Sequence, residues 1–233
     1  MSKKFLLATV AVAGVTLGAA AASAADVEPA PAPESASWYV SLFGGAAWLD
    51  DVDVNYDYRG DPNDAELESK TGFIVGGAIG THLFSDDLRV EIEAAYSENK
   101  LKTIDFDGPG GDYSIDGKFG ILTFMGNLWY DVPLSDEIKP YLGGGAGVAI
   151  VDGDFHYNGQ DTDAFDSSEV AFAFQLGAGL RWMVSENIAL DVGYRFRGID
   201  GPTFDGGDFA GSDKYHTDWF YSHNVIAGVS LGF

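Results

Sequence analysis

The chain has 233 residues, of which 36 are acidic and 13 are basic, and its formal net charge is −23 at pH 7. Because so acidic a surface repels nucleic acids and anionic ligands, we expect no nucleic-acid partner. There is no cysteine, so backbone pairing and packing, not disulfides, must stabilise the fold.

The first 24 residues have the pattern of a secretory signal peptide. Lys3 and Lys4 precede an apolar run over residues 5–22, which ends at Ala22-Ser23-Ala24, a small-x-small cleavage site. A retained transmembrane helix is the alternative, but the run is rich in alanine and glycine. We therefore predict a cleaved signal peptide over residues 1–24, and an exported protein.

Residues 25–37 have the composition of a short extended tether. Three prolines, Pro29, Pro31 and Pro33, are spaced among alanine, glutamate and serine, so this segment cannot bury a core. We expect the tether to lie in the periplasm and to precede one domain, residues 38–233.

From residue 38 onward, apolar and polar side chains alternate in segments of about ten residues. Alternation with a period of two is typical of a β-strand that has one apolar face. Eight such segments follow one another: 38–49, 72–84, 88–96, 118–130, 139–150, 171–183, 188–197 and a last segment that ends with residues 225–233. The fold class predicted from this pattern is all-β.

Four of the five arginines that follow the signal peptide, and three carboxylates, lie in these segments on the face opposite an aliphatic stripe. In residues 88–96 the even positions are apolar or aromatic, whereas odd positions hold an arginine and two glutamates. The residues predicted on the charged face are Arg89, Glu91, Glu93, Arg181, Asp191, Arg195 and Arg197. A soluble sandwich would bury its apolar faces, but so consistent a charged face favours the reverse arrangement, with charges inside and the apolar stripes facing lipid.

Short and long connections alternate along the chain, as in outer-membrane barrels. Short turns are predicted near 85–87, 131–137 and 185–187, and long loops near 50–70, 98–117, 152–169 and 198–218. We predict a monomeric, eight-stranded antiparallel transmembrane up-and-down β-barrel. With the N-terminus in the periplasm, the long loops are extracellular.

Turn lengths predict which residues face each other. If Val184 pairs with Ile188, Arg181 lies directly opposite Asp191. A two-residue turn at 86–87 places His82 opposite Glu91. Because the third and seventh strands of an eight-stranded barrel face each other, Glu91 and Glu93 can also reach Arg195 or Arg197 across the interior. We predict a closed, filled interior, and the alternative is a narrow ion path lined by these charges.

Aromatic residues mark the expected edges of the membrane. Trp38 and Trp48 are ten residues apart, which is roughly 33 Å of strand and roughly 25 Å of membrane once the strand is tilted. The predicted girdle consists of Trp38, Trp48, Tyr130 and Trp182. Trp129, by its parity, is predicted to point inward.

Two glycine-rich stretches, residues 37–45 (SWYVSLFGG) and 139–147 (KPYLGGGAG), and the terminal Phe233 resemble the outer-membrane β-barrel family of proteobacterial surface proteins, which includes opacity-type and rickettsial-type surface antigens and small porin-family proteins. The resemblance implies that the final strand carries a signal read by the barrel-assembly machinery. Gly228, Leu231 and Phe233 fit that signal, whereas Ile226 stands where a polar residue is usual.

The four predicted loops hold 24 of the 36 acidic residues. One interpretation is a solvated, repulsive surface, and the other is binding of divalent cations, which prefer carboxylate ligands. Asp51, Asp53 and Asn55 begin like a calcium loop, but Tyr56 occupies the position that requires glycine in an EF-hand. No residue is assigned as a metal ligand.

Signals for catalysis are weak. Ser222 and His223 are adjacent and should point to opposite faces of a strand, so they cannot easily form a nucleophile and base. Ser212, Asp213 and His216 in the last loop are a further candidate for a lipid-modifying enzyme. We predict no catalytic residue and no cofactor.

The sequence therefore predicts a structural or surface-interaction protein of the Gram-negative outer membrane, in contact with membrane lipid and lipopolysaccharide. A narrow porin-like channel for ions or small solutes is the main alternative.

Overall fold

The computed structural model describes residues 38–50, 52–58, 61–106, 113–114, 116–156, 168–201, 203–205 and 214–233. The predicted signal peptide and tether lie outside these residues. Within them, no helix is long and apolar enough to cross a membrane.

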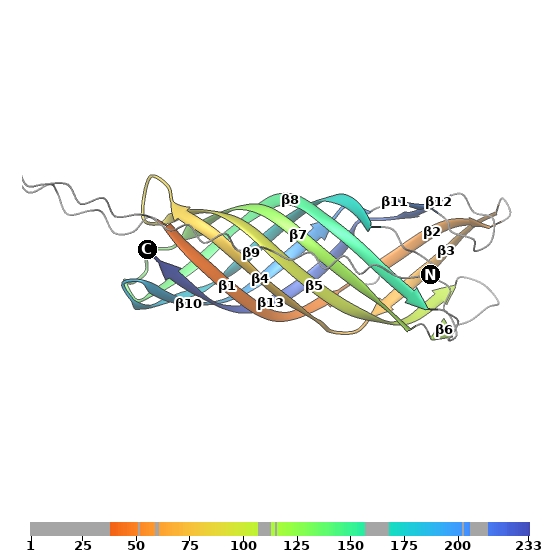
Figure 1. Cartoon of the computed structure of the whole chain (residues 1–233), viewed down its shortest axis with the longest axis horizontal. Helices are drawn as coiled ribbons and strands as arrows, with labels where there is room; N and C mark the ends of the chain where they lie inside the picture. The colour runs from red at the N-terminus through yellow and green to blue at the C-terminus, as the bar shows by residue number, and fades with distance from the viewer. Residues whose placement is uncertain are drawn as a thin grey trace, which may run out of the picture. The chain divides into compact units, whose positions relative to one another are not determined.

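Eight antiparallel strands close into a barrel (Figure 1). They are β1 (Trp38–Leu49), β4 (Gly72–His82), β5 (Leu88–Phe106), β7 (Asp116–Asp131), β8 (Ile138–His156), β9 (Ser168–Ser185), β10 (Ile188–Ile199) and β13 (Phe220–Gly232). Each strand pairs with the next of the eight, and β13 pairs with β1. The predicted fold class and strand number are confirmed.

The barrel has two distinct ends. At the end that we call the turn end, β1 begins, β13 ends, and residues 83–87, 132–137 and 186–187 connect the strands. The opposite end, called the loop end, carries the long connections. The predicted alternation of short and long connections therefore agrees with the topology.

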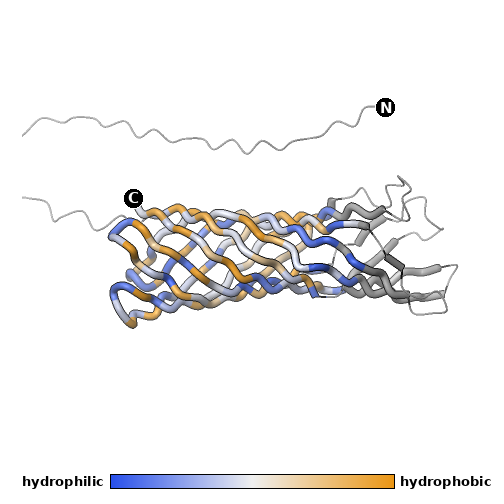
Figure 2. Tube along the Cα trace, turned by 90° about the horizontal axis from the view of Figure 1, so that it is seen from below, coloured by the Kyte–Doolittle hydropathy of each residue, from blue (hydrophilic) through white to orange (hydrophobic). Residues whose placement is uncertain are grey.

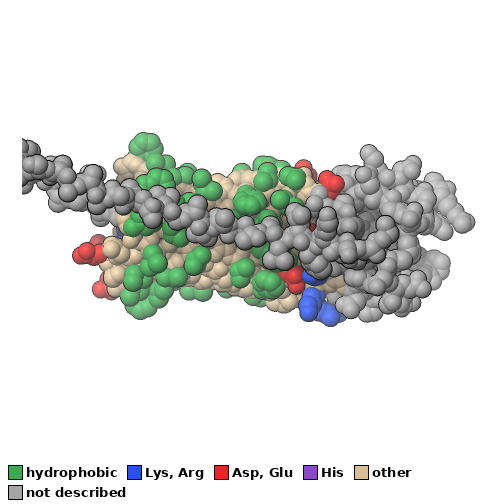
Figure 3. Space-filling model, viewed as in Figure 1, with side chains coloured by type: hydrophobic (Ala, Val, Ile, Leu, Met, Phe, Trp, Pro, Cys, Tyr) green, Lys and Arg blue, Asp and Glu red, His purple; other side chains and the backbone are tan. Residues whose placement is uncertain are grey.

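The outer face of the barrel is apolar. Leu42, Ile92 and Val192 are 63%, 70% and 58% exposed, and many other aliphatic and aromatic side chains on all eight strands are also exposed. Figure 2 shows hydrophobic residues recurring along the strands of the barrel, and Figure 3 shows apolar side chains over the barrel wall. Soluble monomers rarely expose contiguous apolar patches of more than a few hundred Å², so this wall suits a lipid environment.

The segments predicted as long loops are partly strands. β2 (Val52–Tyr58), β3 (Asp61–Ser69), β6 (Tyr113–Ser114), β11 (Thr203–Asp205) and β12 (Lys214–Thr217) lie in them. β5 and β8 each have 19 residues, beyond the roughly 9–11 needed to cross a membrane. A sheet in the order β11-β12-β2-β3-β5 continues past the barrel. The loop predictions were wrong here, although β2 does alternate, with Val52, Val54, Tyr56 and Tyr58 separated by polar residues. The many acidic residues of these segments were interpreted as loop composition instead.

The register predicted at the first turn was wrong by two residues. Leu83 donates its N–H to the carbonyl of Leu88 at 2.8 Å, so the connection is a four-residue loop over 84–87. Phe84 adopts a positive φ of 61° there, which permits the longer loop. His82 consequently lies opposite Arg89, and Gly80 lies opposite Glu91.

The register predicted at the third turn is confirmed for the charged pair, although not for the turn itself. Arg181 lies opposite Asp191. Ile188, however, pairs with Ser185, and an irregularity between Ile188 and Ala189 shifts the register. One extra residue on β9, a β-bulge, restores the alignment that places the two charges together.

We expect Val192→Arg to lower the free energy of unfolding by about 2–4 kcal/mol, because the new charge would face the middle of the apolar wall. The measurement is equilibrium unfolding by denaturant of the barrel refolded into lipid bilayers. Glu186→Arg, in the exposed turn of residues 186–187, is the matched control and should change stability little. Equal losses for the two variants would contradict the assignment of the wall to lipid.

Candidate functional site

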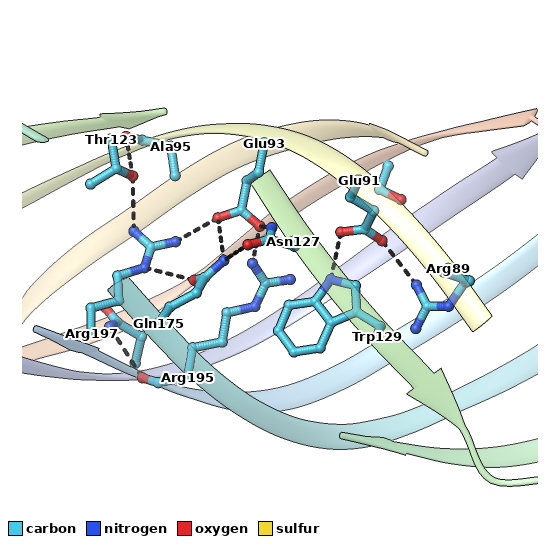
Figure 4. A network of polar contacts seen from close by, with 12 residues as sticks. Arg89, Glu91, Glu93, Ala95, Thr123, Asn127, Trp129, Gln175, Arg195 and Arg197 are labelled. Atoms are coloured by element: carbon cyan, nitrogen blue, oxygen red, sulfur yellow. Dashed lines mark hydrogen bonds and ion pairs between the residues drawn. The ribbon is translucent and has the colours of Figure 1, made fainter. Parts of the chain in front are cut away.

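Glu93 is the centre of the charged interior. It projects inward from β5 and is fully buried. Its Oε1 atom pairs with Nη2 of Arg197 at 2.7 Å, its Oε2 atom pairs with Nη1 of Arg195, and Asn127 donates to Oε2 at 3.1 Å (Figure 4). A carboxylate out of water is stable only when it is paired and its remaining lone pairs are satisfied. These contacts meet that requirement and join β5, β7 and β10.

Neutral side chains complete this layer. The fully buried Gln175 on β9 donates to Oδ1 of Asn127 at 2.6 Å and accepts from Nε of Arg197 at 3.1 Å. Arg197 also donates to Oγ1 of Thr123 at 3.3 Å, and Thr123 donates to the carbonyl of Ala95. The polar layer therefore crosses the whole interior (Figure 4). Thr123, Asn127 and Gln175 share the parity of the inward charged residues on their strands, but nothing in the sequence shows that they bind the charged group.

A second group lies nearer the turn end. Arg89 binds Asp131 through two hydrogen bonds of 2.7 and 2.8 Å and contacts Glu91 at 2.9 Å. Glu91 also accepts hydrogen bonds from the hydroxyl of Tyr39 at 2.6 Å and from Nε1 of Trp129 at 2.9 Å. Trp129 is 1% exposed, so its predicted inward orientation is confirmed. Glu91 is thus satisfied without Arg195 or Arg197.

Asp131 is an interior residue that the sequence reasoning missed. The fourth predicted segment ends at residue 130, whereas β7 continues to Asp131. The signal was available, since Asp131 is two residues after Trp129 and therefore shares its face. Without Asp131, Arg89 has only Glu91 as an acidic partner, so this residue completes the pairing.

The third group, Arg181 and Asp191, is looser. Nη1 of Arg181 is 3.6 Å from Oδ1 of Asp191, and the Asp191 side chain is 16% exposed. Ser230 donates to Asp191 at 3.0 Å, and the hydroxyls of Ser41 and Ser230 are 2.7 Å apart. The guanidinium of Arg181 also lies over the ring of Tyr39, 5.1 Å from its centroid. This pair therefore depends less on direct Coulomb attraction than Glu93 does.

Across the described interior, four arginines face four carboxylates: Arg89, Arg181, Arg195 and Arg197 against Glu91, Glu93, Asp131 and Asp191. The charges thus balance. Among the described residues, Nε of Arg195 is the buried side-chain polar atom without a hydrogen-bond partner. A cavity of about 30 Å³, lined in part by Arg181, Asp191 and Arg195, lies beside it. That volume holds about two water molecules, which is less than a hydrated ion needs.

An apolar plug fills the interior between the polar layer and the loop end. Its members are at most 8% exposed: Leu49, Phe119, Ile121, Met125, Ala149, Val151, Ala171, Ala173, Ile199 and Phe220. Most plug residues lie on the same inner face of their strand as the polar residues, but nearer the loop end. Ile199 lies beyond Arg197 on β10, and Ile121 lies beyond Thr123 on the antiparallel β7. The sequence reasoning predicted a network of charges in a filled interior but not the plug, because apolar residues on both faces of a strand break the alternation.

Glycines make room for the large interior ring of Trp129. A Cβ atom at Gly143 would lie 2.8 Å from Cε3 of Trp129, and one at Gly177 would lie 3.1 Å from its Cη2. Trp129 therefore occupies space that side chains on β8 and β9 would otherwise take.

The four residues of the predicted girdle are all on the outer face, 41–52% exposed. Trp38, Tyr130 and Trp182 are near the turn end, and Trp48 is near the loop end. The sequence reasoning missed a larger aromatic group at the loop end, where rings of β9, β10 and β13 and the residue before β13 pack together. It consists of Phe172, Phe174, Phe196, Trp219 and Tyr221.

The last strand carries the residues of the predicted assembly signal. Leu231 is 52% exposed and Phe233 is 63% exposed, while Gly228 faces inward against Phe43. Ile226, which departs from the usual polar residue, is 3% exposed and packs inside with Ala47 and Ile74. Its apolar character therefore matches its surroundings.

The residues considered for catalysis do not form a site in the described structure. Ser222 is buried and accepts a hydrogen bond from Asn224, whereas His223 lies on the outer face, 2.5 Å from the hydroxyl of Tyr194 and 3.2 Å from Asp50. Ser212 and Asp213 lie outside the described residues, and only the backbone of His216 is described. In the part of the chain that the structure describes, no three His, Cys, Asp or Glu side chains converge as metal ligands.

A family model described as an outer membrane protein β-barrel domain matches residues 10–233. The chain is 27% identical to an uncharacterized protein of Brucella abortus, over 96% of this chain and 97% of the relative. It is 25% identical to a candidate adhesin of Rickettsia conorii, over 82% of this chain and 80% of the relative.

Two solved structures share the fold. The outer membrane protein OprG of Pseudomonas aeruginosa has a TM-score of 0.58 and 19% identity, covering 85% of this chain and 98% of that protein. Neisserial surface protein A has a TM-score of 0.50 and 19% identity, covering 86% of this chain and 99% of that protein. Identities this low relate the architectures alone.

We expect Glu93→Gln to lower the free energy of unfolding by about 3–5 kcal/mol, because two buried arginines would lose their charged partner. Asp191→Asn, the same chemical change at a partly exposed residue 3.6 Å from its arginine, should cost clearly less. Denaturant unfolding of both variants in lipid bilayers measures the difference. Equal losses at the two positions would contradict the central role of Glu93.

Proposed function

Because the chain belongs to the outer membrane protein β-barrel domain family, we propose that it is a closed barrel which acts at the cell surface and conducts no solute. Membership of this family places the chain in the Gram-negative outer membrane. The observation that carries the proposal of a closed barrel is the double obstruction of its interior, first by the polar layer around Glu93 and then by the apolar plug.

The two obstructions exclude ions for different reasons. Passage through the polar layer would require Glu93 to leave Arg195 and Arg197, which would strand three buried charges. Passage through the plug would bring an ion among side chains such as Phe220, Ile121 and Val151, which offer it no ligand and are 0–5% exposed. An eight-stranded barrel is also just wide enough for its side chains to fill.

The orientation that we propose places the turn end in the periplasm and the loop end outside the cell. Short periplasmic turns and longer external loops are the rule for outer-membrane barrels. β1 begins at the turn end, which agrees with a tether that enters from the periplasm.

The surface role rests on the loop end. There the strands continue past the apolar wall, and the sheet β11-β12-β2-β3-β5 extends the barrel. This extension gives an external partner a surface to contact. The Rickettsia conorii relative is named as a candidate adhesin. We propose the same class of activity here, contact with a macromolecule outside the cell, with the predicted acidic loops as the contacting surface.

A narrow channel is the second candidate, and one observation favours it. The cavity beside Arg195 is lined by both signs of charge, from Arg89, Arg181, Asp191 and Glu91, and charged residues at membrane depth often mark ion paths. The cavity lies on the turn-end side of the plug, so a path through the whole barrel would also require the plug to open.

We expect the refolded wild-type protein to show no stable conductance steps in a planar lipid bilayer. Trp129→Ala should also show none because, although it removes the ring beside Gly143 and Gly177 and one hydrogen bond to Glu91, it leaves the polar layer around Glu93 and the apolar plug in place. Trp182→Ala, the same change on the lipid-facing wall, is the matched control and should stay silent. Stable wild-type channels whose ion selectivity follows the charge at position 191 would overturn the closed barrel in favour of the channel.

We expect deletion of Phe233 to impair assembly more than stability. The ring is 63% exposed, and the residue's N–H bonds to the carbonyl of Trp38 at 3.0 Å, so its loss should cost less than the roughly 1.5–3 kcal/mol of a fully buried aromatic. If the barrel-assembly machinery reads this residue, outer-membrane levels in cells should fall sharply, while the purified variant refolds into bilayers with near-normal stability. Normal levels in cells would contradict the assembly role.

A further inference from the structure

Lysines gather at one place on the outer wall near the loop end. Lys100 and Lys102 project outward from β5, and Lys118 projects outward from the neighbouring β7; all three are exposed. The exposed Lys70 is beside them, since its N–H bonds to the carbonyl of Lys100 at 2.7 Å. We call Lys70, Lys100, Lys102 and Lys118 the lysine patch. Figure 3 shows basic side chains gathered at this end of the wall.

The arrangement of the lysine patch is unfavourable for the protein alone. Lys100 and Lys118 are direct cross-strand partners, and like charges in that position destabilise a sheet. Two lysines at the edges of the patch pair with carboxylates. Nζ of Lys102 is 2.8 Å from Oε2 of Glu68, and Nζ of Lys118 is 3.8 Å from Oε2 of Glu98. Asp154 on β8 is opposite Lys118 in register. Lys100, at the centre, has no side-chain partner among the described residues.

The patch begins where the apolar wall ends. Tyr96 and Leu122 are cross-strand partners on the outer face of β5 and β7. The ring of Tyr96 packs against that of Phe73, with 6.1 Å between the ring centroids. Lys100 is four residues beyond Tyr96, which is roughly 13 Å along the strand. At a tilt of roughly 45° this is roughly 9 Å above the apolar wall, the depth at which lipid headgroups replace acyl chains.

From these observations we propose that the lysine patch binds the phosphate groups of a glycolipid in the outer leaflet, a lipopolysaccharide, while its acyl chains lie on Tyr96, Leu122 and Phe124. This proposal rests on the proposed orientation, in which the loop end faces outward. Ammonium groups form charge-assisted hydrogen bonds with phosphate. A phosphate bound between Lys100 and Lys118 would attract both ammonium groups and so offset the repulsion between them.

The kind of ligand follows from the two surfaces that adjoin here, the lysine patch and the apolar wall. A free phosphate ion would use the lysines but not the apolar wall, and an uncharged lipid would use the wall but not the lysines. Only a lipid with phosphate on its headgroup uses both. On so acidic a protein, a soluble anion would also be repelled on approach, whereas a membrane lipid is already beside the patch.

The test uses the refolded full-length mature barrel in detergent micelles that contain phosphorylated lipid A, dephosphorylated lipid A, or inorganic phosphate. We expect phosphorylated lipid A alone to raise the thermal unfolding midpoint of the wild-type protein. Lys100→Gln should weaken lipid A binding about fivefold, the effect of one basic residue near an anionic membrane surface. Without lipid A, the same variant should unfold at a slightly higher temperature than the wild type, because the repulsion from Lys118 is removed.

Two controls make the result specific. Lys139→Gln removes a lysine from the turn end of β8 and should leave lipid A binding unchanged, and Lys100→Arg should retain it. Equal stabilisation by inorganic phosphate would overturn the lipid as occupant, and equal binding by wild type and Lys100→Gln would overturn the site. Binding in micelles does not depend on which end of the barrel faces outward or on conductance, so failure here is distinguishable from failure of the proposed function.

Discussion

The pairing of β13 with β1 is the constraint on which the rest of this structure depends. In the hydrocarbon layer of a membrane no water is available to bind an open strand edge, so backbone N–H and C=O groups must all find partners within the sheet. The register from Tyr39 with Gly232 to Leu49 with Ser222 provides those partners along the whole of β1. Once the sheet closes, every strand has one face toward lipid and one toward an enclosed interior, and side-chain parity becomes the main determinant of environment.

The enclosed face explains the unusual concentration of charge. A barrel of eight strands is too narrow to hold bulk water and must be filled by its own side chains. Arginines and carboxylates can fill it when their numbers match, as four and four do in the described interior, and when buried carboxylates are satisfied, as Glu93 is by Arg195, Arg197, Asn127 and Gln175. Toward the loop end the same space is filled without charge, by the apolar plug. The interior therefore combines two ways of excluding water and ions.

The outer wall is not uniform around the barrel, and its loop-end rim differs from side to side. On β9, β10 and β13 the rim is aromatic, with Phe174 packed against both Phe196 and Trp219. On β5 and β7, which lie across the barrel from β10 and β13 in strand order, it carries the lysine patch. One side is thus suited to the interfacial region of any lipid, whereas the other has the charge to select a phosphorylated headgroup.

By itself the sequence determined the fold class, the number of barrel strands, and the inward face of the seven charged residues predicted there, because alternation along a strand is a local property that closure converts into inside and outside. It also identified Arg181 and Asp191 as neighbours, since their turn is short. It also predicted that Glu93 can reach Arg195 or Arg197 across the interior, and the structure confirms this. Tertiary structure alone decided that Glu93 binds both arginines, that Asp131 binds Arg89, and that Trp129 binds Glu91. It also decided that the loop end is closed by apolar residues and that Lys100 faces Lys118. These contacts depend on register between strands and on where each strand ends. A bulge at residue 184 or a four-residue loop at 84–87 changes register by one or two positions while leaving the alternation of the sequence intact.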